Sequence, residues 1–482
     1  MTDEIYTEDR MKQLPVYPTK QTPSYADWNL FKMGQELEEK VNGVSGNVYT
    51  KSEIDAKIEV LAEKDLTNVN VGSGNAGRYI QVADDGTLQY TDIPQSGYGF
   101  VIAQIDETVL ETSPYNGVTY PASVVVDGVF YRNSIDGESF REAKGTDIRD
   151  WTNHMLIKGI KPVYIDDGVI TDISDKVDMS NWDESKDAFT QFPFNWLSIT
   201  KSGSKITIIF SDSATKPSAS FVDYAFLDNN GIRQNAFHIG CFDASDATDL
   251  SSKVGATPLV STSLTNFISY ATTKGTQYDI VTYDMQTYLT ALAVVMFKTV
   301  DLQGTSDSTH GLGKGITSKN AVQTNEALEF DNNFGMYGDT TDATKPVSFF
   351  WIENIFGNLS QWVGGAYIDE NRKLKRNIGQ RSSTSTFNAE VITGLEADVA
   401  GNDVRTTIGS GIGGFCPLTT SGTNYTIGYT DLGRVTASRF PSWGGYYGGG
   451  DVAGVFCVNF DVAASNTYGL LGSRLSCKIG SA

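Results

Sequence analysis

Few residues of this sequence are spaced for catalysis. Its three histidines fall in separate segments, at His154, His238 and His310. None of them has a neighbour at the spacing that metal ligands use, and no G-x-S-x-G nucleophile elbow is present. His238 alternates with apolar Phe237 and Ile239 in a strand-like run, which indicates a structural residue rather than a base. The sequence therefore predicts no metal centre, no serine triad and no cofactor.

A pair of carboxylates is the remaining route to catalysis, because glycoside hydrolysis places two of them across the sugar bond. The candidates are Asp223, Asp243, Asp246, Glu326, Glu329 and Asp331. In a chain with 58 acidic residues such neighbours arise by chance. A polysaccharide hydrolase is therefore kept as an alternative, and the main expectation is a protein that is not an enzyme.

Residues 438–480 carry the clearest functional signal. Five glycines occur between 444 and 450, where they free the backbone of a loop, and aromatic rings are interleaved with them. This composition suits an adaptable recognition surface. The apolar runs at 455–458 and 470–471 favour buried strands that would hold such loops. We expect the binding residues to be Arg439, Phe440, Ser442, Trp443, Tyr446, Tyr447, Asp451, Asn459, Asp461, Asn466 and Tyr468.

Composition limits the classes of protein to which this chain can belong. The chain has 482 residues, of which 40% are hydrophobic, which is enough for several packed cores. No secretory signal opens it, and its longest apolar stretch, residues 291–297, is too short to span a membrane. The net charge of −21 argues against nucleic acid as a partner. The cysteines are too few and scattered for a disulfide scaffold and are predicted to be buried thiols: Cys241, Cys416, Cys457 and Cys477.

The N-terminal residues are predicted to bundle several copies of the chain. Residues 1–25 contain three prolines among polar residues, which suits an extended docking arm. Residues 26–66 carry apolar residues at coiled-coil spacing, namely Leu30, Met33, Leu37, Val41 and Val44, then Ile54, Ile58 and Leu61. Two seams this short are not stable alone, so they predict helices that associate with identical chains, as a trimer. The alternative is one amphipathic helix that packs on its own chain.

Turn signals predict the β-structure that follows. Residues 67–97 hold an Asp-Gly turn between mixed polar and apolar runs, which predicts a β-hairpin shaft segment. Residues 98–190 hold several apolar runs separated by Asn-Gly and Asp-Gly turns, which predict a small β-rich spacer domain. Helices, a hairpin and a larger body in this order resemble the shafts of bacteriophage tail fibres and receptor-binding proteins.

Residues 191–482 differ from the preceding residues in their pattern of predicted strands and helices. Apolar runs at 206–210, 225–227 and 237–242 are predicted strands. One helix is expected after the N-cap Ser263, and a second, apolar on most of its circumference, over residues 283–298. Two helices among many strands, in no repeating order, predict an α+β domain.

A more specific resemblance appears at residues 351–363, WIENIFGNLSQWV, taken with 237–240, the two helices and the closing 472–475. This set resembles the formylglycine-generating-enzyme type of C-type-lectin fold, in the ligand-binding branch found in phage tail-fibre tips and in the variable proteins of diversity-generating retroelements. The likeness covers roughly residues 190–482. It implies a solvent-exposed binding face at 438–468.

The same resemblance implies a scaffold that includes Trp351, Trp362 and Arg474. We expect both tryptophans to pack inward and Arg474 to be a buried guanidinium satisfied by carbonyls. Catalytic relatives need a close cysteine pair for copper or clustered histidines for iron, and this sequence has neither. The Glu-Pro-Asn and Trp-Asn-Asp triplets of calcium-dependent lectins are absent too. A structural calcium among loop residues stays open, at Asp331, Asn332 and Asn333.

These observations predict an elongated, homotrimeric tail-fibre adhesin. Its N-terminus would dock on a virion tail or baseplate protein, and its C-terminal loops would bind a bacterial surface receptor, glycan or protein, without altering it. Such a protein is made in the host cytoplasm and acts outside the cell as part of the virion, without membrane insertion. Three copies would gain avidity from weak sites. The alternatives are a fibre-borne depolymerase, a bacteriocin fibre, or a non-viral variable-type display protein.

Overall fold

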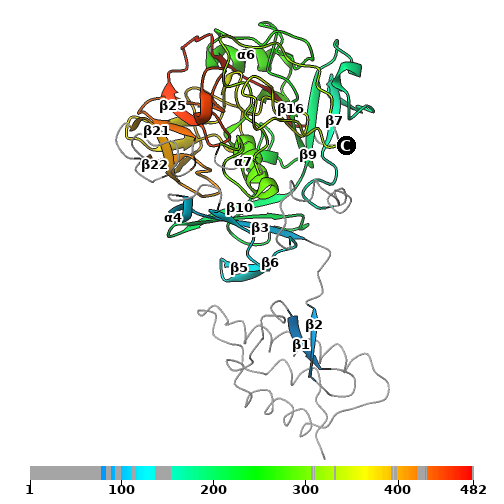
Figure 1. The fold of residues 1–482 in the computed structure, drawn as a ribbon, viewed down its shortest axis with the longest axis vertical. Coiled ribbons are helices and arrows are strands. Elements are labelled where there is room, and N and C mark those ends of the chain that lie inside the picture. The colour runs from blue at the N-terminus through cyan, green and yellow to red at the C-terminus, as the bar shows by residue number, and fades with distance from the viewer. Residues whose placement is uncertain are drawn as a thin grey trace, which may run out of the picture. The chain divides into compact units, whose positions relative to one another are not determined.

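The computed structural model describes most of the chain after residue 98. The described residues are 78–82, 88–92, 99–110, 116–135, 154–305, 308, 310–330, 333–391, 395, 399–420, 429 and 431–479. The chain divides into two compact units, Met1–Gln95 and Ser96–Ala482. The described part is mostly β with few helices (Figure 1). The arm expected at 1–25 and the coiled-coil helices expected at 26–66 lie outside the described residues.

In the first unit the structure describes one antiparallel hairpin. It consists of β1 (Arg78–Val82) and β2 (Leu88–Asp92), with Val82 opposite Leu88. The prediction of a hairpin within residues 67–97 is confirmed for these two strands.

The second unit is built on three larger sheets. The five-stranded sheet has the order β12-β10-β11-β3-β4, from β3 (Phe100–Asp106), β4 (Val118–Thr119), β10 (Trp196–Ser202), β11 (Lys205–Ser211) and β12 (Phe221–Val222). The six-stranded sheet has the order β14-β27-β13-β9-β7-β8, from β7 (Lys161–Asp166), β8 (Val169–Asp172), β9 (Ala188–Pro193), β13 (Ala236–Gly240), β14 (Tyr278–Ile280) and β27 (Leu475–Cys477). The seven-stranded sheet has the order β22-β21-β23-β25-β24-β17-β26, from β17 (Ser360–Trp362), β21 (Val399–Thr407), β22 (Pro417–Thr420), β23 (Leu432–Val435), β24 (Phe440–Trp443), β25 (Val458–Val462) and β26 (Leu471–Gly472).

Smaller elements complete the unit. The three-stranded sheet contains β18 (Ala366–Ile368), β19 (Leu374–Arg376) and β20 (Ala389–Val391). Two hairpins are formed by β5 (Ser123–Val126) with β6 (Val129–Arg132) and by β15 (Ser348–Phe349) with β16 (Ile352–Glu353). The short helical turns are α4 (Glu107–Leu110), η3 (Met179–Asn181), η4 (Tyr224–Phe226) and η5 (Gly450–Val452).

Two longer helices were both predicted, and both predictions are confirmed. α7 (Tyr283–Phe297) is buried along its whole length, as its continuous apolar circumference requires. Its side chains join the largest core cluster with those of β3, β10 and β11, and Figure 1 shows it in the interior of the unit. α6 (Leu264–Lys274) begins where Ser263 Oγ accepts a hydrogen bond from the Asn266 amide. None of the helices in the described part of the chain has the length and hydropathy that a bilayer crossing requires.

The six-stranded sheet separates these helices because its side chains alternate between two faces. Phe192 and Phe237 are cross-strand partners with ring centroids 5.1 Å apart, and they join the core cluster that contains α7. Val163 and Phe189 are partners on the other face and join the cluster that contains α6. The last strand, β27, lies between β13 and β14 and pairs with both, so it joins β14 to the rest of the sheet.

Two sequence-based expectations are corrected by the structure. The boundary at residue 190 does not separate a spacer from a second domain, because β3 pairs with β11 over its whole length and β7 pairs with β9. Residues 225–227 do not form a strand. They belong to the turn of η4, where Phe226 packs into the core, because an apolar run of three residues fits a buried turn as well as a strand.

Candidate functional site

The C-terminal part of the chain forms most of the seven-stranded sheet, and one row of side chains runs across it. Arg434 of β23 lies opposite Asn459 of β25, and Asn459 lies opposite Ser442 of β24. Ser442 in turn lies opposite Trp362 of β17. Cross-strand partners share a face of the sheet, so these four side chains belong to one face. Trp362 is 0% exposed, whereas the Arg434 side chain is 43% exposed, so this face opens toward β23.

The open end of this face is a strip of polar groups. Arg434 Nη1 donates to Asp461 Oδ2 at 3.1 Å, and Asn459, two residues before Asp461 on β25, lies opposite Arg434. We call Arg434, Asn459 and Asp461 the polar strip. The opposite face of the same strands carries Val435 and Phe460, which belong to a closed core cluster. The strip is thus carried on a rigid backbone, and its guanidinium and carboxylate groups can bind a polar partner by hydrogen bonds.

Three members of the predicted binding set lie in the core instead. Trp443 is 1% exposed, Phe440 6% and Ser442 3%. The Trp443 ring lies edge-on to the ring of Tyr283 on α7, with centroids 5.8 Å apart. The expectation that these residues are displayed is wrong, because β24 is an inner strand between β17 and β25 and all four of its residues are buried. Aromatic residues beside glycines do not by themselves distinguish a displayed loop from the end of a buried strand.

The glycine-rich loop that follows β24 holds two further members of the set. Tyr446 and Tyr447 are both half-buried, and their rings meet edge-to-face with centroids 5.6 Å apart. Backbone hydrogen bonds fix the loop, since the Tyr447 amide donates to the Asn358 carbonyl at 2.9 Å and its carbonyl accepts from the Lys319 amide at 2.8 Å. Asp451 is exposed and lies 3.3 Å from Lys314 Nζ. This loop is held in one conformation and is not freely adaptable.

A second loop, residues 463–470, carries the most exposed ring of the predicted set. Tyr468 is 53% exposed, and its hydroxyl accepts a hydrogen bond from Asn466 Nδ2 at 3.1 Å. The Tyr468 carbonyl accepts from the Ser261 amide at 3.2 Å, which ties the loop to the segment before α6. Arg439, the remaining member, is half-buried and pairs through its backbone with Ile368 of β18. The predicted residues therefore divide among the sheet and two separate loops.

Arg474 holds the scaffold beneath these elements. It is 2% exposed and donates to the Gly240 carbonyl at 3.0 Å, to the Glu353 carbonyl at 2.6 Å and to Asp243 Oδ1 at 2.9 Å. Asp243 also accepts from Asn358 Nδ2 at 2.9 Å, and the carbonyl of the same asparagine holds the Tyr447 amide. The predicted buried guanidinium is confirmed, with Asp243 as an added partner. Trp351 and Trp362, at 1% and 0% exposure, pack inward as expected.

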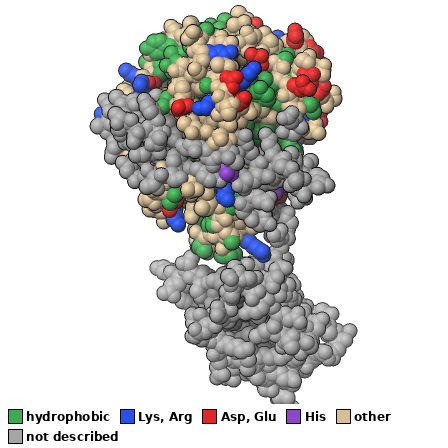
Figure 2. Space-filling model, in the orientation of Figure 1, with side chains coloured by type: hydrophobic (Ala, Val, Ile, Leu, Met, Phe, Trp, Pro, Cys, Tyr) green, Lys and Arg blue, Asp and Glu red, His purple; other side chains and the backbone are tan. Residues whose placement is uncertain are grey.

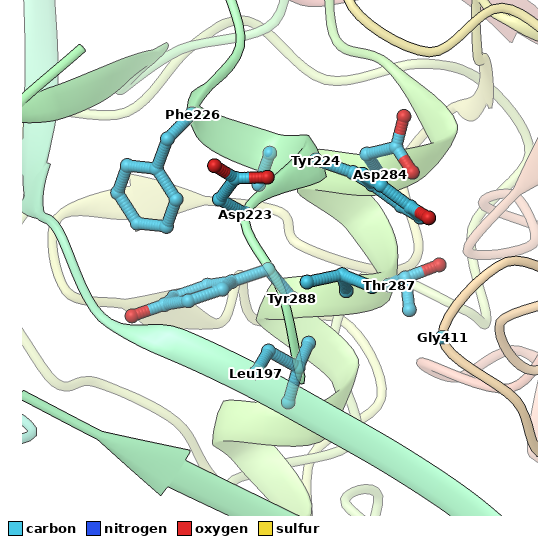
Figure 3. A pocket seen from close by; sticks show the side chains of 10 residues that line it. Leu197, Asp223, Tyr224, Phe226, Asp284, Thr287, Tyr288 and Gly411 are labelled. Carbon is cyan, nitrogen blue, oxygen red and sulfur yellow. The ribbon is translucent and has the colours of Figure 1, made fainter. Parts of the chain in front are cut away.

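Two carboxylates are among the residues that line one pocket. Its lining includes Asp223 and Tyr224 of the η4 region and Asp284 and Tyr288 of α7. Figure 3 shows the carboxylates apart, Asp223 on one side and Asp284 with Tyr224 on the other. Asp284 Oδ1 accepts from Arg376 Nη2 at 2.6 Å, within a fully buried ion pair. A carboxylate held this way serves as the partner of Arg376, so the pocket offers Asp223 as its less constrained acid.

The cysteines and His238, which were the other candidates for reactive side chains, are buried. All four cysteines are free and buried, and burial raises the pKa of Cys241 and of Cys416 to about 12. Burial lowers the pKa of His238 to about 4. In the described part of the chain no group of three or more His, Cys, Asp or Glu side chains is placed to hold a metal ion. Asp331 and Asn332, considered for calcium, lie outside the described residues.

Sequence reasoning missed Arg434. The signal was available in principle, because apolar Val435 directly follows Arg434, and consecutive residues of a strand point to opposite faces. What the sequence does not reveal is that β23 lies parallel to β25, which places Arg434 beside Asn459 and Asp461. Parallel neighbours are distant in sequence and leave no local pattern.

Comparison with known proteins gives likenesses of fold only. No protein family matches the chain, and no curated protein matches it. Among solved structures it is similar to the Major Tropism Determinant U1 variant, at 14% identity and a TM-score of 0.23, with 83% of this chain and 94% of that one covered. The M1 variant gives 15% identity and a TM-score of 0.25 over the same shares. PvdO from Pseudomonas aeruginosa gives 11% identity and a TM-score of 0.25, with 61% of this chain and 95% of that one covered. Similarity at these identities and TM-scores says nothing of function.

Proposed function

We propose that the chain is a receptor-binding protein of a bacteriophage tail fibre, which attaches the virion to a molecule on a bacterial surface without altering it. The observation that carries the binding role is the polar strip. Arg434, Asn459 and Asp461 stand on strands whose opposite face is closed by the core. A partner that binds there does not have to order the backbone first, so little conformational entropy is lost on binding.

The exposed ring of Tyr468 adds a second element of support. Tyrosine offers a large contact area with few torsions to fix, and this one is carried on a loop tied to Ser261 by a backbone hydrogen bond. Acidic and basic side chains are interspersed on the face seen in Figure 2, so charge of one sign does not dominate the described part of it. Recognition through hydrogen bonds and ring contact fits such a surface.

The order of the predicted segments along the chain supports the proposal that the protein is part of a virion. A docking arm and short self-associating helices are predicted ahead of the body, as in fibre shafts. We propose that they bind a virion tail or baseplate protein and bundle three chains. Three copies raise the effective concentration of weak sites, so each surface can bind its receptor modestly.

The test is binding of the fluorescently labelled full-length chain to intact cells of a panel of bacterial strains. A double variant, Arg434→Ala with Asp461→Ala, is expected to lose at least about tenfold in binding, as removal of two charged hydrogen-bonding groups implies. The matched control is Lys161→Ala with Asp172→Ala, which removes a surface ion pair of 2.6 Å on β7 and β8. Equal loss in both double variants, with unchanged thermal unfolding, would show that the polar strip is not the binding surface.

Treatment of the cells separates the receptor classes. Periodate is expected to abolish binding if the receptor is a glycan, and protease if it is a protein. The alternative function is a fibre-borne depolymerase, for which Asp223 is the candidate acid. Release of reducing ends from purified surface polysaccharide, lost in Asp223→Asn, would favour that enzyme over an inert adhesin. The protein that binds residues 1–25 would distinguish a virion fibre from a bacteriocin fibre or a non-viral display protein.

A further inference from the structure

A small internal cavity lies between α7 and Arg474. All of its lining side chains are buried, and it has room for about one water molecule. Three of the lining residues are polar, namely Gln286 of α7, Gln361 of β17 and Arg474 itself. The others are apolar: Ile239, Val281, Leu289, Ile352 and Ile355. A wholly apolar cavity stays dry, so the three polar side chains decide what this one holds.

Gln286 brings a donor that the protein leaves unpaired. Its side chain is 6% exposed, and its amide nitrogen has no hydrogen-bond partner among the protein groups of the described chain. Burial of a donor without an acceptor costs free energy, and few side chains of folded proteins are left in this state. An acceptor is therefore expected beside Gln286.

Arg474 has one N–H group left over after its protein partners are counted. A guanidinium side chain offers five such groups. Nε donates to Gln361 Oε1 at 3.3 Å and Nη1 donates to the Gly240 carbonyl at 3.0 Å. Nη2 donates to Asp243 Oδ1 at 2.9 Å and to the Glu353 carbonyl at 2.6 Å. The second N–H of Nη1 has no acceptor among the residues that the structure describes.

Gln361 offers an acceptor in the same cavity lining. Its Nε2 uses both hydrogens, one toward Asp243 Oδ1 at 2.9 Å and one toward the Asn354 carbonyl at 3.2 Å. Its Oε1 accepts from Arg474 Nε, and a carbonyl oxygen has a second lone pair. The polar lining thus supplies two donors and one acceptor. A water molecule can accept from both donors and donate to the acceptor, and buried waters typically make about three hydrogen bonds.

We propose that this cavity binds one structural water molecule, which joins α7 to the hydrogen bonds of Arg474. The proposal does not depend on what the C-terminal surface binds. A cation would meet the guanidinium of Arg474, and an anion would meet the carboxylate of Asp243, which lies 2.9 Å from that guanidinium. A neutral molecule that both donates and accepts satisfies the lining without either repulsion.

The first test is a high-resolution crystal structure of the full-length chain. One ordered water is expected within hydrogen-bonding distance of Gln286, Gln361 and Arg474. Absence of density in the cavity would overturn the proposal, and so would a side chain that fills the cavity. This measurement needs no variant, so it decides the matter even where a substitution in the core prevents folding.

The second test uses magnetic relaxation dispersion of the water signal, which counts long-lived internal waters in solution. Gln286→Met keeps the length of the side chain and removes its amide, and it is expected to lose one long-lived water. The matched control is Ile355→Val, which removes one methyl group from the apolar lining and leaves the three polar groups in place. It is expected to keep the water count of the unmodified chain. An unchanged count in Gln286→Met would contradict the bridge to α7.

Discussion

The side chain of Arg474 donates hydrogen bonds to acceptors in three separate segments, which contain Gly240 with Asp243, Glu353, and Gln361 of β17. It reaches the Gly240 carbonyl, the Glu353 carbonyl and the Asp243 carboxylate, and the ion pair with Asp243 is 2% and 0% exposed. Desolvation of two charges is costly, so such a pair stabilises a fold only while both partners are present. Its role is to fix β13, β16 and β17 in relation to one another.

Replacement of Arg474 by Met is therefore expected to lower the free energy of unfolding by about 3–5 kcal/mol, because it leaves Asp243 buried and unpaired. The matched control is Arg434→Met, which removes the Arg434–Asp461 pair, whose side chains are 43% and 25% exposed. An exposed pair contributes about 0–1 kcal/mol. Urea denaturation of both variants is the measurement, and equal losses would contradict the role assigned to Arg474.

Glu353 is fully buried close to Asp243. Burial, with the nearby Asp243 charge as the second cause, raises its pKa well above the usual range. It accepts from the Glu326 amide and from Asn354 Nδ2, and Asn354 Oδ1 has no hydrogen-bond partner in the structure. If the Asn354 amide is rotated by half a turn, that oxygen faces the protonated carboxyl, which satisfies both groups.

Glu353→Gln is then expected to cost less than about 1 kcal/mol, because glutamine also offers a donor and an acceptor to Asn354 and to the Glu326 amide. Glu353→Ala removes both and is expected to cost about 2–3 kcal/mol. Denaturation at neutral pH compares them. A glutamine variant as unstable as the alanine variant would mean that Glu353 is ionised in the folded protein.

At the scale of elements, the local patterns predicted well. Ser263 begins α6, the apolar circumference of residues 283–297 gives a buried α7, and Asp-Gly sequences sit in the turns of β5–β6 and β7–β8. These signals are local, because caps and turns depend on a few consecutive residues. β24 was misread because its burial depends on β17 and β25, which lie elsewhere in the sequence.

The burial of β24 reverses the expectation for Trp443. Trp443→Ala removes a ring packed on Tyr283 and is expected to cost about 3–5 kcal/mol. Tyr468→Ala, at a ring that is 53% exposed, is expected to leave the unfolding temperature almost unchanged and to weaken binding to cells. Thermal unfolding and the cell-binding assay separate the two. A fully stable Trp443→Ala protein would return that ring to the candidate binding surface.

At the scale of the whole molecule, the features that the sequence did not predict depend on which strands pair with each other in the sheets. Residues 98–190 were expected to fold as a spacer, yet β3 lies between β11 and β4 in one sheet and β7 lies between β9 and β8 in another. The polar strip likewise depends on the parallel pairing of β23 with β25. Pairing between distant segments is set by the fit of whole faces, and composition along the chain does not encode it locally.

Stability of the second unit is expected to fall between pH 6.5 and pH 4. Burial lowers the pKa of His238 and of His154 to about 4, whereas the unfolded chain has the ordinary value near 6.5. The unfolded state then binds more protons in this window, so the free energy of unfolding rises with pH, and the contribution is complete above pH 6.5 and lost by pH 4. For His238 it amounts to about 3 kcal/mol.

His238→Gln is expected to flatten this part of the stability profile while His154→Gln, tested beside it, reports the second histidine. Carboxylates such as Asp183 and Asp339 titrate separately, because hydrogen bonds from Ser185 and Thr341 lower their pKa values and their stabilising effect is lost only at more acid pH. Urea midpoints measured from pH 4 to pH 8 give the slopes. A His238→Gln profile parallel to that of the unmodified chain would mean that the imidazole becomes protonated without unfolding, and that the sheet between α6 and α7 admits water to it.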